Sequence, residues 1–168
     1  EARYYVGRRK YVAIFPSKGR FYCALFALPA KEHSYTRQTN TRAFLGQKFA
    51  DMGTDVAQLL EHLPHEPHAL FHHDDNEVHI KQWHNGKVAL IGDAAHALSS
   101  ATGMGASLAM EDAFVLAEEL KGQESVEKAL ENYVARRRPR VTFAAMISRH
   151  LHRLSLVPES AYGIRNFL

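Results

Sequence analysis

The sequence contains few features that would suit a secreted or membrane-embedded protein. It has a single cysteine, Cys23, among 168 residues, which excludes an internal disulfide framework and is typical of proteins from a reducing compartment. No apolar run approaches the length that spans a membrane, and no secretory hydrophobic segment is visible. We therefore expect a cytoplasmic protein that makes no use of a membrane.

The sequence also lacks a strong excess of charge of either sign. It carries 21 Lys and Arg against 18 Asp and Glu, a net charge of +3. Four arginines nevertheless lie close together, at Arg136, Arg137, Arg138 and Arg140, on a helical pattern. This cluster has no interleaved aromatic residues on which bases would stack. We expect a solvated helix face that pairs with nearby acids, and nucleic-acid binding is the weaker alternative.

A compact metal-binding pattern is absent as well. Several histidines and acids are close in sequence, but their spacing crosses a proline-rich turn and matches no known zinc pattern. They are His62, His65, His68, His72, His73, Asp74 and Asp75. We interpret them as residues of exposed loops and strand ends, and we predict no metal site.

The first half of the chain has the pattern of a small sheet followed by helices. Strand-like segments with aromatic and β-branched residues are followed by a helical pattern that Gly53 divides in two. The expected elements are strands near Tyr4–Val6, Tyr11–Phe15 and Phe21–Leu28, helices within Thr41–Leu63, and further strands at Ala69–His72 and Val78–Trp83. Aromatic side chains on these strands either line a pocket or fill a core, and core is the commoner case. They are Tyr11, Phe15, Tyr22, Phe26 and Trp83.

The second half is predicted to be mainly helical. One amphipathic helix ends near Gly122, and Ser125 is a suitable N-cap for the next. Pro139 should break or kink that second helix, and a helical pattern resumes over Val141–Leu156.

The most informative segment lies between these halves, at residues 87–112. Asn85-Gly86 predicts a turn, and the apolar run Val88–Ile91 predicts a strand buried on both faces. Asp93 follows just past the strand end, where open α/β sheets place ligand groups. Gly103 and Gly105 then mark a helix start whose unpaired amides favour an anion. An acceptor for sugar hydroxyls beside such amides suits a polyhydroxylated, phosphorylated cofactor. Alternatively, Asp93 only caps a turn.

These residues resemble the second flavin-binding motif of class A FAD-dependent aromatic monooxygenases, the relatives of p-hydroxybenzoate hydroxylase. The resemblance rests on an ordered set of features spread over about fifty residues. They are Gly92-Asp93-Ala94-Ala95-His96, Gly103-x-Gly105, Glu111-Asp112-Ala113, Leu116-Ala117-Glu118-Glu119-Leu120 and Tyr133-x-x-x-Arg137-x-Pro139-Arg140. Any one alone would be weak, but their order makes the similarity specific.

The resemblance implies roles for particular residues. Asp93, with Gly92 and Ala94, would bind the ribityl or pyrophosphate part of FAD. The helix start would lie against the pyrimidine edge of the flavin ring, where a helix dipole stabilises negative charge. That start comprises Gly103, Met104, Gly105, Ala106 and Ser107. His96 and Asp112 are expected to hold the local structure by hydrogen bonds, and no residue is assigned a catalytic role.

The sequence departs from the family pattern in three respects. Ser100 stands where proline is frequent, and Ser107 where asparagine is frequent. More importantly, residues 1–168 contain no Gly-x-Gly-x-x-Gly unit for the ADP part of FAD. We therefore expect that an N-terminal half supplied in cis or in trans completes the FAD site, unless the chain is a remnant with another role.

These interpretations combine into one hypothesis. The fold class is α/β, with α+β character in this chain: the C-terminal part of an FAD/NAD(P)-binding Rossmann-like fold, with part of a substrate-binding β-sheet and C-terminal helices. Residues 1–84 would belong to the substrate-binding region and residues 85–168 to the FAD-binding domain. The resemblance implies a monooxygenase that uses FAD, NAD(P)H and O2 on an aromatic or apolar small molecule. The alternative is a non-catalytic binding module with a vestigial flavin motif and basic C-terminal helices.

Overall fold

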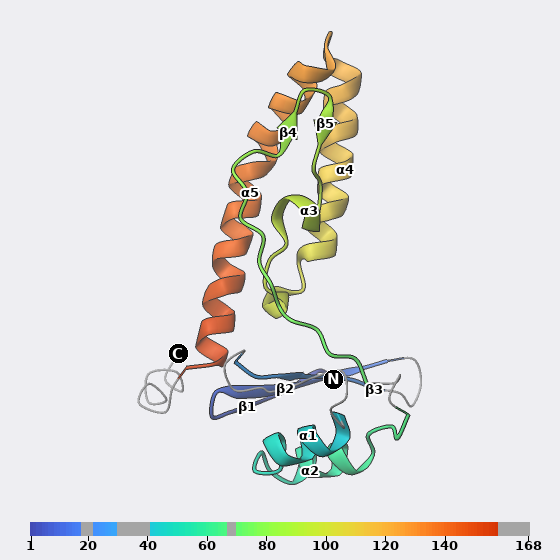
Figure 1. The fold of residues 1–168 in the computed structure, drawn as a ribbon, viewed down its shortest axis with the longest axis vertical. Helices are drawn as coiled ribbons and strands as arrows, with labels where there is room; N and C mark the ends of the chain where they lie inside the picture. The colour runs from blue at the N-terminus through green and yellow to red at the C-terminus, as the bar shows by residue number, and fades with distance from the viewer. Residues whose placement is uncertain (18–21, 30–40, 67–69, 158–168) are drawn as a thin grey trace. The chain divides into compact units, whose positions relative to one another are not determined.

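The computed structural model of the protein describes residues 1–17, 22–29, 41–66 and 70–157 and divides into two compact units (Figure 1). The first comprises Glu1–Asp74 with the chain from Leu154 onward, and the second comprises Asp75–Arg153. Asp75 belongs to the second unit because its carboxylate accepts hydrogen bonds from the Ser99 hydroxyl, at 2.9 Å, and from the Ser100 amide, at 3.1 Å. The second unit therefore begins before residue 84, where the sequence had suggested a boundary.

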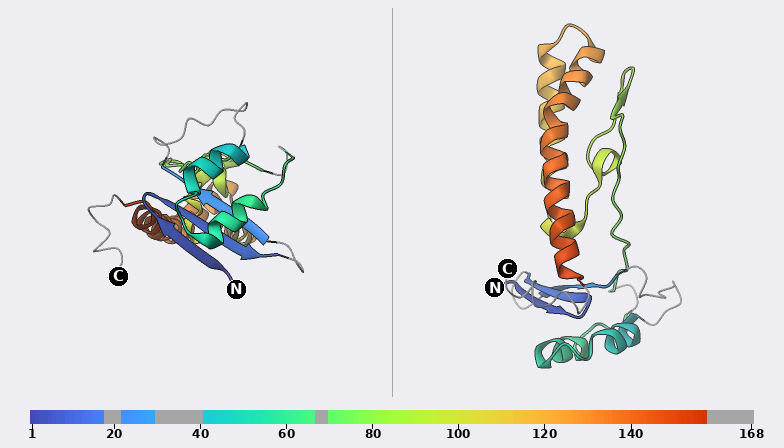
Figure 2. Two further views of the ribbon diagram at one scale, coloured as in Figure 1. Left: turned by 90° about the horizontal axis from the view of Figure 1, so that it is seen from below. Right: turned by 90° about the vertical axis from the view of Figure 1, so that its left-hand side faces the viewer.

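The first unit is a three-stranded antiparallel sheet covered by two helices. The strands β1 (Arg3–Gly7), β2 (Lys10–Pro16) and β3 (Tyr22–Ala27) follow one another in the sheet, as the sequence predicts. Helices α1 (Thr41–Phe49) and α2 (Thr54–Glu61) lie on one face of this sheet (Figure 2). Residues 18–21, between β2 and β3, lie outside the described residues.

The core of the first unit forms where the helices meet the sheet. Val12, Phe49 and Val56 are completely buried, and the Phe26 ring packs edge-on against Phe49 at 5.1 Å between centroids. Gly53 separates the two helices with a φ of 94°, a conformation that favours glycine, and this confirms the predicted division. Two aromatic residues from the sheet, Tyr11 and Phe26, thus contribute to packing, Tyr11 being itself buried.

The second unit is built on two long antiparallel helices. Helix α4 (Gly105–Gly122) and helix α5 (Val126–Ser155) lie side by side, and the Ser125 hydroxyl accepts the Lys128 amide at 3.2 Å as the predicted N-cap (Figures 1 and 2). Against them lies a short hairpin, β4 (His84–Asn85) and β5 (Val88–Ala89), followed by α3 (Asp93–His96) and the 3-10 turn η3 (Ser100–Thr102).

A mixed aromatic and aliphatic core joins these elements. Trp83, Ala95, Leu108 and Tyr133 are buried together, and Val115, Val141 and Ala144 extend the cluster along the helices. Trp83 therefore lies in a core, and the Arg138 guanidinium lies 5.0 Å from the centroid of its ring. None of the described helices combines the length and the apolar composition needed to cross a membrane.

Two expectations from the sequence are wrong in the described residues. The strands predicted at Ala69–His72 and Val78–Trp83 are not found there, since none of the residues 70–83 is assigned to a strand. The motif strand is limited to Val88–Ala89. It pairs only with β4 within the described chain, so Val88 is 68% exposed rather than buried on both faces.

A third expectation, that Pro139 breaks or kinks its helix, is wrong as far as a break is concerned. Helix α5 continues through this residue without interruption over 30 residues. Proline removes one hydrogen-bond donor from a helix. The packing of Val141, Ala144 and Ser148, all buried on the same side beyond it, keeps the helix continuous.

Candidate cofactor-binding site

The predicted motif begins with a turn that requires glycine at its first position. Gly92 is buried and has φ 56° and ψ −139°, a region that L side chains rarely adopt. A Cβ at this position would lie 3.1 Å from the Cβ of Ala109 on α4. Asp93 and Ala94 follow as the exposed first residues of α3. The turn therefore packs tightly on α4 while presenting the Asp93 carboxylate to solvent.

The second half of the motif is an open helix start. Gly103 has a left-handed φ of 64° and ends η3, and α4 begins two residues later at Gly105. No side chain of the described residues caps this end, and its first turn contains no acid. The first-turn amides of a helix have no carbonyl partner within the helix, so they are available as donors. Ala106 and Ser107 are exposed here, and Met104 is half-buried.

The structure brings these two halves together. A Cβ placed on Gly105 would lie 4.0 Å from Oδ1 of Asp93, so the carboxylate lies beside the start of α4. The site thus combines a carboxylate acceptor, free helix amides and glycine positions that leave room for a ligand. This donor and acceptor set fits the hydroxyls and anionic groups of FAD.

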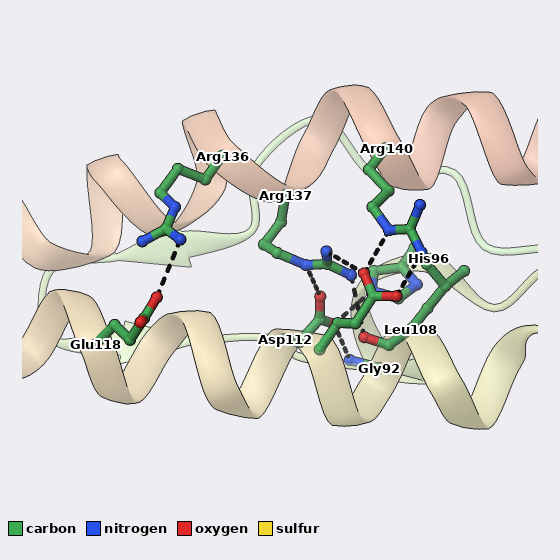
Figure 3. Close-up of polar contacts among 9 residues, drawn as sticks. Gly92, His96, Leu108, Asp112, Glu118, Arg136, Arg137 and Arg140 are labelled. Carbon is green, nitrogen blue, oxygen red and sulfur yellow. Dashed lines mark hydrogen bonds and ion pairs between the residues drawn. The ribbon is translucent and has the colours of Figure 1, made fainter.

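Behind the turn, a buried carboxylate joins three segments of the chain (Figure 3). Asp112 on α4 has 0% exposure. Its Oδ2 accepts the Gly92 amide at 2.8 Å and lies 2.5 Å from Nε2 of His96. Its Oδ1 accepts Nε of Arg137 from α5 at 2.7 Å. His96 and Asp112 therefore hold the local structure, as the sequence predicts.

The arginine cluster of α5 pairs with acids of α4, and one member is buried. Arg137 is 3% exposed and donates both to Glu111, at 2.6 Å, and to the Leu108 carbonyl, at 3.2 Å. Arg140 donates from Nη2 to Glu111 at 2.6 Å. The hydrogen bonds from Arg140 and then Arg137 lower the pKa of Glu111 from 4.5 to about 2. The expected pairing with acids is confirmed, but the expectation of a solvated face is wrong for Arg137 because it faces Asp112.

The same helices share a second ion pair further from the turn. Arg136 donates to Glu119 at 2.7 Å. It also donates to Glu118 at 3.0 Å (Figure 3). The Arg136 hydrogen bond lowers the pKa of Glu119. This pair joins α4 to α5, and its acids Glu118 and Glu119 lie outside the predicted cofactor-binding residues 92–94 and 103–107.

The family of the chain follows from a match that includes all of these residues. Residues 9–148 match the protein family described as "FAD binding domain". The chain belongs to this family.

Relatives of this FAD-binding domain include several hydroxylating enzymes. The chain is 34% identical over 139 residues to the FAD-dependent urate hydroxylase of Klebsiella pneumoniae, covering 82% of this chain and 35% of the relative. It is 33% identical over 136 residues to the kynurenine 3-monooxygenase of Xanthomonas axonopodis, covering 79% of this chain and 29% of the relative.

A solved structure shows that the fold is shared. The FAD and uric acid complex of HpxO from Klebsiella pneumoniae superposes with a TM-score of 0.84 at 27% identity, over 99% of this chain and 43% of that protein. The predicted fold class, a mixed α/β fold of the flavin monooxygenase type, is thereby confirmed. The chain spans less than half the length of each of these proteins.

The buried ion pair between Asp112 and Arg137 was not predicted from the sequence of this FAD-binding domain. The burial of Arg137 and its contact with Asp112 were not expected, although a signal was present. Asp112 is spaced four residues after Leu108, and Arg137 four residues after Tyr133, so each charge occupies a position on the buried stripe of its helix. Tyr133, beside this ion pair, donates from its hydroxyl to the Leu90 carbonyl at 3.2 Å. Burial, and then the nearby Asp112 charge, raises the pKa of the Tyr133 hydroxyl.

Proposed function

We propose that this chain forms the flavin-facing part of an FAD-dependent monooxygenase that uses NAD(P)H and O2 to hydroxylate an aromatic or other apolar organic molecule. The observation that carries this proposal is the Asp93 carboxylate beside the uncapped start of α4, in a chain that belongs to the FAD-binding domain family. When bound, FAD supplies the electron transfer between NAD(P)H and oxygen.

Each proposed site residue has a role that follows from its chemistry. Asp93 accepts hydrogen bonds from the sugar-like hydroxyls of the cofactor, and Gly92 and Ala94 shape the turn that presents it. The backbone amides of Gly103, Met104, Gly105, Ala106 and Ser107 face the electron-rich edge of the flavin ring. A helix N-terminus favours negative charge by roughly 0.3–1 kcal/mol at an exposed site. These residues bind and orient the cofactor, and none of them transfers a proton.

The substrate class is proposed from the relatives. The urate hydroxylase and the kynurenine 3-monooxygenase are named for aromatic compounds, and HpxO was solved with uric acid. A planar, nitrogen-containing aromatic molecule is therefore the first substrate class to screen.

A further part of the polypeptide is proposed to complete the site. Helix α4 exposes Met110 by 67% and Phe114 by 64%, and Val88 of β5 is 68% exposed. Large apolar side chains grouped on one element are typical of a surface that another element covers. We propose that the remaining FAD-binding polypeptide, in cis or in trans, covers this face. The single cysteine supports a cytoplasmic location for the assembled enzyme.

The proposal is tested on the complete gene product that contains this chain. We expect it to purify with a flavin absorption spectrum and to oxidise NAD(P)H faster when an aromatic substrate is added. A complete protein that neither retains nor binds added FAD would refute the proposal.

A variant then tests the assigned residue. Asp93→Ala removes charged hydrogen bonds worth roughly 1.5–3 kcal/mol, which corresponds to about 10- to 150-fold weaker FAD binding. Glu127→Ala is the matched control, since Glu127 is also an exposed acid in the first turn of a helix. The assignment of Asp93 fails if both variants bind FAD with the same Kd.

A further inference from the structure

We infer that Asp112 is a positioning residue for the cofactor site: it holds the Gly92–Asp93 turn and the start of α4 in register, and Arg137 holds Asp112 in place. This inference rests on the proposed function, because it concerns how tightly the same site binds FAD. Asp112 and Arg137 are buried and do not themselves reach the exposed Asp93 side of the turn.

The two oxygens of the Asp112 carboxylate contact different elements of the second unit. Oδ2 faces the turn, where it accepts the Gly92 amide at 2.8 Å and contacts Nε2 of His96 at 2.5 Å. Because a carboxylate oxygen only accepts, Nε2 of His96 carries the hydrogen of this bond. Oδ1 faces α5, where it accepts Nε of Arg137 at 2.7 Å. One rigid side chain thus fixes both ends of α3 against the two long helices.

The contacts reach both halves of the proposed site. The Gly92 amide belongs to the peptide between Ile91 and Gly92, so its bond to Asp112 fixes the backbone one peptide before the Asp93 side chain. Arg137 also donates to the carbonyl of Leu108, which lies one turn from the start of α4. A displacement of the Asp112–Arg137 pair, drawn in Figure 3, would therefore shift the Gly92 turn, and with it the Asp93 carboxylate, relative to the start of α4.

Burial makes this arrangement sensitive to a single change. The side chains of Asp112 and Arg137 are 0% and 4% exposed, so neither can replace a lost partner with bulk water. Removing one partner of a buried pair leaves an uncompensated charge, whereas replacing both partners by apolar side chains of similar size is often tolerated. The two kinds of change separate the stability of the protein from the placement of the turn.

The same helices provide a matched control. Glu119 is 9% exposed and pairs with Arg136 of α5 at 2.7 Å, much as Asp112 pairs with Arg137. Among the described residues, the Glu119 carboxylate forms no hydrogen bond with the Gly92–Asp93 turn. A role limited to joining α4 to α5 predicts similar effects for both pairs, whereas a positioning role predicts an effect on FAD for Asp112 alone.

The experiment uses the complete gene product and compares the double variant D112L/R137M with E119Q. FAD affinity is measured by titrating the apoprotein and following flavin fluorescence, and Tm is measured on the same apoproteins. We expect D112L/R137M to lower Tm moderately, because the buried Gly92 amide and His96 lose their acceptor, and to bind FAD at least about 10-fold more weakly. The E119Q variant should lower Tm and leave the Kd for FAD unchanged.

A second variant decides the matter if the double variant does not fold. Asp112→Asn keeps the size of the side chain and removes its charge, so it loosens the pair with Arg137 without creating a cavity. Weaker FAD binding by this variant than by E119Q, at equal Tm, supports the inference, and a Kd equal to that of the wild type overturns it. If the wild-type protein itself binds no FAD, the proposed function fails first, and the two failures are thereby distinguished.

Discussion

Substituting Gly92 by alanine should destabilise the second unit, for two reasons that can be separated. The backbone at Gly92 has φ 56° and ψ −139°. A non-glycine residue held in such a region costs about 1–3 kcal/mol. The new Cβ would also lie 3.1 Å from the Cβ of Ala109, and over-packing of this kind adds about 1 kcal/mol. The expected loss of unfolding free energy for G92A is therefore about 2–4 kcal/mol.

A double-mutant cycle separates the backbone strain from the steric contact. A109G alone should cost about 1 kcal/mol, the penalty for glycine inside a helix. In G92A/A109G the contact is relieved while the backbone strain remains. The double variant should therefore be less destabilised than the sum of the single variants, by roughly 0.5–1 kcal/mol.

Chemical denaturation followed by tryptophan fluorescence provides the measurement. Trp83 is the single tryptophan and is 4% exposed in the core of the second unit, so its emission reports the unfolding of that unit. Gly122→Ala is the control, because at the end of α4 no described atom lies within 4 Å of its added Cβ. The reasoning is refuted if G92A and G122A change the unfolding free energy by the same amount.

Four further predictions concern the same unit. Leu108→Ala should cost about 2–5 kcal/mol, because Leu108 is completely buried. Tyr133→Phe should cost about 1 kcal/mol, because the Leu90 carbonyl loses its donor. Ser125→Ala should cost about 0.5–2 kcal/mol by removing the N-cap of α5. All three are measured by denaturation. Glu111 has a pKa of about 2 against an ordinary 4.5, so its stabilisation is complete above pH 4.5 and is lost as the pH falls towards 2. In E111Q the unfolding free energy should fall less steeply between pH 4.5 and pH 2. A pH profile identical to that of the wild type would contradict this prediction.

The helices were predictable because their signals are local. Gly53 divides α1 from α2 and Ser125 caps α5, and each of these features depends only on neighbouring residues. The strands predicted around Val78–Trp83 failed because a strand is defined by its partner, which a single segment cannot reveal. In the structure, Val78 donates to the Ala97 carbonyl and Leu90 to the Trp83 carbonyl, and these isolated bonds hold an extended chain without a sheet.

In the candidate site, too, the local features could be predicted and the long-range contact could not. The Gly92–Asp93 turn and the start of α4 could be identified from glycine spacing, because the positive φ of Gly92 and Gly103 strongly favours glycine. That Asp93 lies beside Gly105 could only be expected from the resemblance, since no local rule relates residues twelve positions apart across an irregular loop.

The ion pair at Asp112 shows what a careful pattern analysis could still have recovered. Leu108, Asp112, Val115 and Glu119 follow one another at four-, three- and four-residue spacings and form the buried stripe of α4. Tyr133, Arg137, Val141 and Ala144 form the corresponding stripe of α5. An acid on one apolar stripe and a base on the other can be buried only if they meet, since an isolated buried charge is prohibitively costly. Asp112 and Arg137 are therefore expected to face a partner across the helix pair, and the short connection between Gly122 and Val126 makes α4 and α5 antiparallel neighbours.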